Sequence, residues 1–262
     1  MFLKKRNWAK FNRRKMLDIK TMKDLFSSQS SLYQKARPNY PTAVIEEILK
    51  HVKHTERAWG CGAGSGQFTQ LLSPYFKEII ATDLSRQQIA QAPKFENVQY
   101  LVQPAESNHF PSAYFDLVTV AQAIHWFNFD AFYKEVKRVL KPNGIFAVVG
   151  YGLIQLADVK VNALIQTLYF ETLKGYWDAE RKYVDEEYLT IPFPFHEITT
   201  AKLQMEYRWS AMQLLDYLNT WSAIKHYKTK NLNDPLEALK QNISDSEQLF
   251  DVEFPILLRF GK

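Results

Sequence analysis

A glycine-rich segment followed by a single acidic residue carries the clearest chemistry in this sequence. Gly60, Gly62, Gly64 and Gly66 stand between a stretch that predicts a strand and one that predicts a helix. Glycine lets a backbone turn sharply and lets a ligand approach the peptide plane closely. The start of the helix would offer free N–H groups to an anionic part of that ligand. Asp83 ends the next predicted strand, where a carboxylate can accept both hydroxyls of a ribose, so the segment indicates a nucleoside-containing cofactor.

The spacing of the glycines narrows the choice of cofactor. A dinucleotide site has the pattern G-x-G-x-x-G, whereas this segment reads G-x-G-x-G. A Walker loop ends in Gly-Lys followed by Ser or Thr, and this segment does not. The remaining common cofactor of this loop geometry is S-adenosylmethionine. A tight structural turn capped by Asp83 is the alternative.

Two further side chains could act on the group that receives the methyl. His125 follows a predicted strand whose C-terminal end would face the ligand crevice of an open α/β sheet. Its imidazole could orient or deprotonate the acceptor, or it could be a hydrogen-bonded structural residue. Arg37 could bind a carboxylate of the cofactor or of the substrate through two hydrogen bonds, or it could be a surface residue beside Pro38.

Short apolar stretches alternate with helical patterns through the first 150 residues. We expect strands at 58–59, 79–82, 98–102, 115–120 and 145–149, and helices at 43–52, 67–72, 85–92 and 129–140. Such alternation predicts a parallel sheet with helices on both faces. Pro142-Asn143-Gly144 predicts a turn before the last of these strands.

The last third of the chain follows a different pattern. Residues 203–209 alternate apolar and polar side chains, which predicts a half-buried strand, and 252–260 predicts another. Helices are expected at 157–175 and 212–218 and from Asp234 as N-cap. Because no repeat or low-complexity linker separates these elements, one domain with an elaborated cap is expected rather than two domains.

The composition is typical of a globular protein with a reducing, cytoplasmic location. Hydrophobic residues make up 46% of the chain and charged residues 23%, which excludes a long disordered polymer and a collagen-like repeat. Cys61 is the single cysteine, so an internal disulfide is excluded. The sequence has no apolar run that predicts a membrane span or a secretory signal, so we expect no membrane partner.

Positive charge gathers near the N-terminus. Residues 1–24 carry a net charge of +7, and the remainder carries −2. Such a segment could bind nucleic acid or a membrane surface, or it could be a solvated extension, which we expect here. We therefore expect residues 1–23 to form a disordered or partly helical leader. Residues 24–262 would form a single domain, with cap segments at about 24–42 and 153–245.

Several motifs give the chain a family resemblance. The loop at 58–67, the A-T-D-x-S pattern at 81–85, the P-A-E triplet at 104–106, the D-L-V-T-x-A-Q-A-x-H-W-F stretch at 116–127 and the Y-x-x-x-R-P-x-Y-P segment at 33–41 carry it. The chain resembles class I S-adenosylmethionine-dependent methyltransferases over about residues 24–260. More closely, it is similar to the small-molecule branch that contains trans-aconitate methyltransferase.

The resemblance implies a fold, a reaction and a set of site residues. The fold would be α/β, a Rossmann-like and mostly parallel sheet with an antiparallel C-terminal strand and a helical, aromatic cap. The enzyme would transfer a methyl group to a small-molecule carboxylate, hydroxyl or amine and release S-adenosylhomocysteine, without a metal, as a monomer or homodimer. The residues implied for the cofactor are Gly60, Gly62, Gly64, Gly66, Asp83, Leu84, Ala105, Glu106 and Gln122, and those implied for catalysis are His125, Arg37 and Tyr33.

One departure from the family pattern concerns Gly60. The family has an acid at this position, which is expected to brace the loop and help hold the amino group of the cofactor. A non-catalytic cofactor-binding relative is therefore one alternative function. A nucleic-acid or protein methyltransferase guided by the basic leader is another. The residues 121–124 lack the Asp/Asn-Pro-Pro-aromatic tetrad of DNA amino-methyltransferases, and the single cysteine lies in the glycine segment, so action on nucleic-acid bases is disfavoured.

Overall fold

A single twisted sheet organises the protein. The computed structural model describes residues 36–243 and 247–262. Within them, the strands are β1 (Arg57–Cys61), β2 (Glu78–Asp83), β3 (Val98–Val102), β4 (Phe115–Ala121), β5 (Leu140–Tyr151), β6 (Gln155–Leu156), β7 (Gln204–Ser210) and β8 (Leu249–Gly261). Their order across the sheet is β3-β2-β1-β4-β5-β8-β6, and β7 also pairs with β8. The leader and Tyr33 lie outside the described residues.

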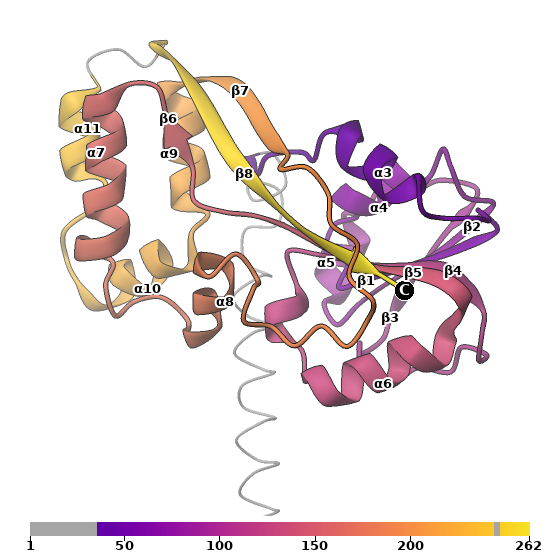
Figure 1. Ribbon diagram of the computed structural model, residues 1–262. Coiled ribbons are helices and arrows are strands. Elements are labelled where there is room, and N and C mark those ends of the chain that lie inside the picture. Colours follow the sequence, from indigo (N-terminus) through magenta and orange to yellow (C-terminus); the bar gives the residue numbers. More distant parts are fainter. Residues whose placement is uncertain (1–35, 244–246) are drawn as a thin grey trace, which may run out of the picture.

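The strand directions confirm the predicted α/β class. Strands β3, β2, β1, β4 and β5 are parallel, and β8 is antiparallel to β5. Strand β8 has two halves with different partners. Residues 256–261 pair with β5, whereas residues 249–255 pair with β7 and, over two residues, with β6. One strand therefore belongs both to the parallel core and to the antiparallel ribbon of the cap (Figure 1).

Helices cover both faces of the core sheet, as the sequence predicts. They are α3 (Thr42–Leu49), α4 (Gln67–Leu72), α5 (Arg86–Ala90) and α6 (Phe129–Val139). Figure 1 shows α3 and α4 on one side of the sheet and α6 on the other. Side chains alternate accordingly along β1, where Ala58 packs in the cluster with α3 and α4, and Trp59 packs in the cluster with α6. The runs of buried residues in β2 and β4 follow from this coverage on both faces.

The cap forms around the outer half of β8. Its helices are α7 (Val159–Thr167), α8 (Lys182–Asp185), α9 (Ala211–Asn219), α10 (Ser222–Lys230) and α11 (Glu237–Asn242). Met205 and Trp209 of β7 are buried and Glu206 and Arg208 are exposed, so the period of two in the sequence predicted this strand correctly. Figure 1 shows α7, α9, α10 and α11 gathered beside the β6-β8-β7 ribbon.

Several element boundaries differ from the sequence predictions. The predicted turn at 142–144 lies within β5, where the register against β4 shifts and Asn143 has a φ of +66°. The helix predicted at 157–175 ends at Thr167 and continues as a π-helical turn, Leu168–Thr172. Helix α11 begins at Glu237, so Asp234 is not its N-cap; the Asp234 side chain instead accepts a hydrogen bond from the N–H of Leu236 in the preceding turn. Helix α10 was missed.

The described residues contain no helix that is both long and apolar enough to cross a membrane.

Candidate functional site

The glycine-rich segment begins inside the sheet. The sequence predicts all four glycines in a loop, but Gly60 is the fourth residue of β1 and is buried. Strand β1 pairs with β2 on one side and with β4 on the other, so the backbone of Gly60 is held extended near the middle of the sheet. The loop itself therefore contains Gly62, Gly64 and Gly66.

The three loop glycines adopt backbone conformations that other residues rarely take. Their φ angles are +63°, +56° and +80°. A Cβ on Gly62 would lie 2.7 Å from the Cβ of Ala123, and one on Gly66 would lie 2.7 Å from the hydroxyl of Tyr100. A Cβ on Gly64 would meet no atom within 4 Å. The loop is thus packed at both ends and open at Gly64, where a ligand can approach the backbone.

Asp83 ends β2 and holds the loop. Its Oδ2 accepts a hydrogen bond from the N–H of Gly64 at 2.8 Å, and its Oδ1 accepts one from the N–H of Ser85 at 2.7 Å. Burial raises the pKa of Asp83, and the backbone donors oppose that rise only in part. Each carboxylate oxygen can accept a second hydrogen bond, so Asp83 can brace the loop and still receive a ligand hydroxyl. The contact to a ribose stays a prediction.

The residues expected beside the cofactor differ in their surroundings. The Leu84 side chain follows Asp83 and is 40% exposed, so it offers an apolar surface next to the carboxylate. Ala105 is buried. The Glu106 carboxylate accepts a hydrogen bond from the N–H of Asn128 at 3.0 Å, and Asn128 caps the start of α6. Glu106 therefore has a structural role that was not predicted from the sequence.

Gln122 stands at the carboxyl end of β4 with a φ of +53°. Its Nε2 donates a hydrogen bond to the carbonyl oxygen of Tyr151 at 3.2 Å, and its Oε1 accepts one from the hydroxyl of Tyr188 at 2.9 Å. A non-glycine residue in this conformation costs about 1–3 kcal/mol, and such strain concentrates at functional sites. The Gln122 side chain thereby joins the end of β5 to the cap.

His125 lies in a short 3-10 turn just beyond Gln122 and is 9% exposed. Its Nδ1 is 3.4 Å from the hydroxyl oxygen of Tyr188, and the two rings stack with centroids 6.0 Å apart. Burial, assisted by the positive charge of Arg181, lowers the pKa of His125 to about 3. The imidazole is therefore neutral at physiological pH and better suited to orienting a group by a hydrogen bond than to storing a proton.

Arg37 joins the core to the cap on another side of the site. Its Nη1 donates to the hydroxyl of Tyr151 at 2.9 Å, and its Nη2 donates to the carbonyl oxygen of Thr220 at 3.5 Å. Lys225 on α10 is close enough that the charge of Arg37, after burial, lowers its pKa. Two cations on one side of the site favour an anionic group on the ligand.

A third cation, Arg181, is half-buried and was not predicted from the sequence. Arg181 donates through Nε to the hydroxyl of Tyr169 at 2.6 Å and to a carboxylate oxygen of Asp185 at 3.2 Å. Its guanidinium lies 5.1 Å from the ring centroid of Trp177. No motif marks these residues, and only the repeated aromatics of the cap could have drawn attention to them.

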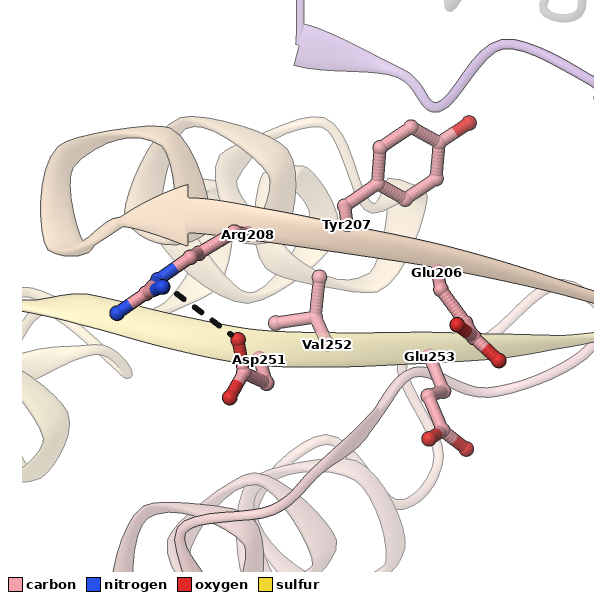
Figure 2. Close-up of a pocket in the computed structure, with 6 residues that line it drawn as sticks. All are labelled: Glu206, Tyr207, Arg208, Asp251, Val252 and Glu253. Carbon is pink, nitrogen blue, oxygen red and sulfur yellow. Dashed lines mark ion pairs between the residues drawn. The ribbon is translucent and has the colours of Figure 1, made fainter.

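A separate recess of about 270 Å³ lies on β7 and β8 (Figure 2). It is lined by Glu206, Tyr207, Arg208, Asp251, Val252 and Glu253. Arg208 pairs with Asp251 at 3.9 Å, with both side chains more than two-thirds exposed, and Glu206 faces Glu253 across the strands. The recess contains none of the predicted site residues and is an acidic surface of the cap ribbon.

Comparisons with known proteins find similarity over the part of the chain that contains the candidate site. A family model described as a methyltransferase domain matches residues 59–148, which include the loop, Asp83, Gln122 and His125. A Dictyostelium discoideum protein named as a methyltransferase is 34% identical over 249 residues, covering 91% of this chain and 95% of its own. A Saccharomyces cerevisiae protein named as an S-adenosylmethionine-dependent methyltransferase is 33% identical over 129 residues, 45% of this chain and 44% of its own.

A solved structure is similar to most of this chain. A structure described as a type II methyltransferase from Anaeromyxobacter dehalogenans matches with a TM-score of 0.79 and 37% sequence identity. The match covers 86% of this chain and 97% of that one.

Proposed function

This chain belongs to the S-adenosylmethionine-dependent methyltransferase family, and on that premise we propose that it methylates a small-molecule acceptor. The burial of His125 carries the proposal. This residue stands at the carboxyl end of β4, where an acceptor would meet the methyl group, yet it is 9% exposed and the fully buried Tyr188 covers it. A macromolecular substrate would need a more open approach to this point, so a small molecule fits better.

The residues fit the cofactor that the family uses. Asp83 retains the capacity to accept ribose hydroxyls, Leu84 offers apolar surface beside it, and Gly64 leaves the loop open. When bound, S-adenosylmethionine supplies the electrophilic methyl group of its sulfonium. The chain itself contributes positioning: the loop and Asp83 hold the nucleoside, His125 orients the acceptor, and Arg37 attracts an anionic group.

The cofactor site is tested by the variant Asp83→Ala. Losing the carboxylate removes the proposed ribose contacts and the hydrogen bond that braces Gly64. The affinity for S-adenosylhomocysteine should therefore fall by at least about tenfold, which is the value of one charge-assisted hydrogen bond. Isothermal titration measures the affinity, and Asp251→Ala in the recess of β7 and β8 is a matched control for loss of a carboxylate. Wild-type affinity in Asp83→Ala would overturn the assignment of Asp83.

The acceptor is tested by turnover. The full chain is supplied with S-adenosylmethionine and, separately, with small carboxylic acids, phenols and alcohols, amines, a DNA and RNA mixture, and a denatured protein mixture. Release of S-adenosylhomocysteine and mass analysis of the product identify the acceptor. We expect methylation in one of the small-molecule sets. Methylation of nucleic acid or protein alone would overturn the proposal, as would cofactor binding without turnover of any acceptor.

A further inference from the structure

Tyr188, a fully buried residue of the cap, contacts both residues that close the reacting end of the site. We infer that Tyr188 is a positioning residue that fixes the His125 imidazole with its proton on Nδ1, so that Nε2 is left to accept a hydrogen bond. The inference concerns the same site as the proposed function and names the chemical class of its acceptor.

The hydrogen bond between Gln122 and Tyr151 fixes which atoms donate in the bonds that follow, between Gln122 and Tyr188 and between Tyr188 and His125. The carbonyl oxygen of Tyr151 can only accept, so the group of Gln122 that faces it at 3.2 Å is the Nε2 amide donor. The other end of the amide, Oε1, then faces Tyr188 and can only accept, which makes the Tyr188 hydroxyl the donor at 2.9 Å.

A hydroxyl carries one hydrogen, and Tyr188 already donates it in the hydrogen bond to Gln122. Toward His125 Nδ1, 3.4 Å away, the tyrosine oxygen can therefore only accept, so Nδ1 must carry the hydrogen. In a neutral imidazole the second nitrogen then holds a lone pair. Burial keeps this imidazole neutral, since it lowers the pKa of His125 to about 3.

The fold supports this chain of bonds at three points. A Cβ on Gly150 of β5 would lie 2.6 Å from Cε2 of Tyr188 and 2.8 Å from Oε1 of Gln122, so glycine is needed for their approach. Tyr188 and Gln122 both have left-handed backbones, with φ of +61° and +53°. Arg259 of β8 donates to the carbonyl oxygen of Tyr188 at 2.8 Å and holds the segment in place. The left-handed backbone of Gln122 indicates a constraint on the site. That of Tyr188 belongs to the turn after α8, where its N–H donates to the carbonyl oxygen of Tyr183 at 2.7 Å.

The consequence concerns the methyl acceptor. A nitrogen lone pair at Nε2 can accept a hydrogen bond from a hydroxyl or an N–H group, and it offers nothing to a carboxylate oxygen. Among the acceptors of the proposed function, the tautomer therefore favours an alcohol, a phenol or an amine. His125 would orient the proton-bearing atom and would remain neutral while doing so.

Nitrogen-15 NMR of the histidine side chains tests the tautomer directly and needs no substrate. The full chain is labelled at its six histidines, and His125→Gln identifies the signals of His125. A nitrogen that bears hydrogen resonates far from one that does not, so each spectrum reports which nitrogen is protonated. In the wild type we expect hydrogen on Nδ1 of His125. Hydrogen on Nε2 would overturn the inference without any variant.

Two variants separate the hydrogen-bond chain from ordinary packing. Gln122→Met removes the acceptor for the Tyr188 hydroxyl, which can then donate to Nδ1 of His125 instead. The imidazole hydrogen should therefore move from Nδ1 to Nε2, although no hydrogen bond joins Gln122 to His125. Tyr188→Phe removes both roles, and the preference for Nδ1 should fall by about two- to tenfold, the value of one ordinary hydrogen bond. Tyr133→Phe is the control, because its buried hydroxyl has no hydrogen-bond partner among the described residues.

The outcomes distinguish the inference from the proposed function. An unchanged tautomer in folded Gln122→Met, or an equal change in Tyr133→Phe, would overturn the role of Tyr188. The expected tautomers, together with no methylation of any small molecule, would overturn the proposed function and leave the role of Tyr188 in place. Methylation of a carboxylate only would overturn the narrowing to hydroxyl and amine acceptors.

Discussion

Replacing Gly60 with aspartate would restore the acid that is expected at this position in the methyltransferases that this chain resembles. The structure accommodates the change, because Gly60 lies within β1 and its φ is outside the left-handed region. A Cβ there would lie 3.2 Å from Oγ1 of Thr69 and 4.0 Å from Oγ1 of Thr119. The closer contact requires Thr69 to move by a few tenths of an ångström, and its hydroxyl can then donate to the new carboxylate.

The variant should gain affinity and lose stability. One charge-assisted hydrogen bond to the cofactor is worth about 1.5–3 kcal/mol, or roughly ten- to a hundredfold in affinity for S-adenosylhomocysteine. The new carboxylate is buried and lies one strand away from Asp83. Its lost hydration should lower the free energy of unfolding by about 1–3 kcal/mol. For a protein of this size that corresponds to a melting temperature lower by about 2–12 °C.

Isothermal titration with S-adenosylhomocysteine and thermal melting test the two effects together. Gly60→Ala is the matched control, since it adds the same Cβ without the carboxylate and should leave the affinity unchanged. Equal affinity in Gly60→Asp and the wild type would refute the reasoning. A gain in Gly60→Ala as large as in Gly60→Asp would refute it too, because the loss of backbone freedom in β1, and not the carboxylate, would then be the cause.

Two further predictions concern ion pairs. Arg259 donates to both carboxylate oxygens of Glu197, at 2.7 and 2.8 Å, and these hydrogen bonds lower the pKa of Glu197. The pair therefore stabilises the fold at pH values above the ordinary carboxyl pKa. This stabilisation is lost as the pH falls through the lowered pKa. Because Glu197 is 43% exposed, Glu197→Gln should cost about 0.5–1 kcal/mol near pH 7, and its melting temperature should converge with that of the wild type in acid below about pH 4; a constant difference would contradict this. Asp116 is 5% exposed and accepts from Lys141 at 2.8 Å, so Lys141→Met should lower the unfolding free energy by about 2–3 kcal/mol in urea denaturation, whereas a change below about 0.5 kcal/mol would show that Asp116 needs no cation.

Much of the core was predictable because its signals are local. Strands β2, β3 and β4 are short apolar runs between turn residues, and each was predicted to within a residue or so. The N-cap at Ser85 was predicted from its type and position, and its side chain accepts from the N–H of Gln88. Helix α10 was missed because its N-cap position holds Trp221, which accepts no hydrogen bond at the helix start.

The site was predictable only in part. The loop glycines and Asp83 are recognisable from their residue types and spacing. The sequence does not show where the strand ends and the loop begins, so Gly60 was wrongly predicted to lie in the loop. Tyr188 stands out in the sequence only as one of several cap aromatics, and its contact with Gln122 was not predictable because the two residues are 66 positions apart. Its left-handed backbone lies in the turn that ends α8, where the N–H of Tyr188 donates to the carbonyl oxygen of Tyr183 at 2.7 Å, and Arg259 of β8 binds the carbonyl oxygen of Tyr188.

The double pairing of β8 has a consequence for how the protein folds. Phe146 pairs with Gly261, 115 residues further along the chain, and the whole cap lies between them. Closing so long a loop costs entropy before the pairing returns any stability, so β8 should add late and slowly. Until it does, β5 is an edge strand whose residues 144–151, buried in the folded protein, are a surface on which partly folded chains can associate. Once β8 is paired, neither the core nor the cap can unfold without breaking the hydrogen bonds of the strand that they share. We therefore expect both to unfold in one cooperative transition.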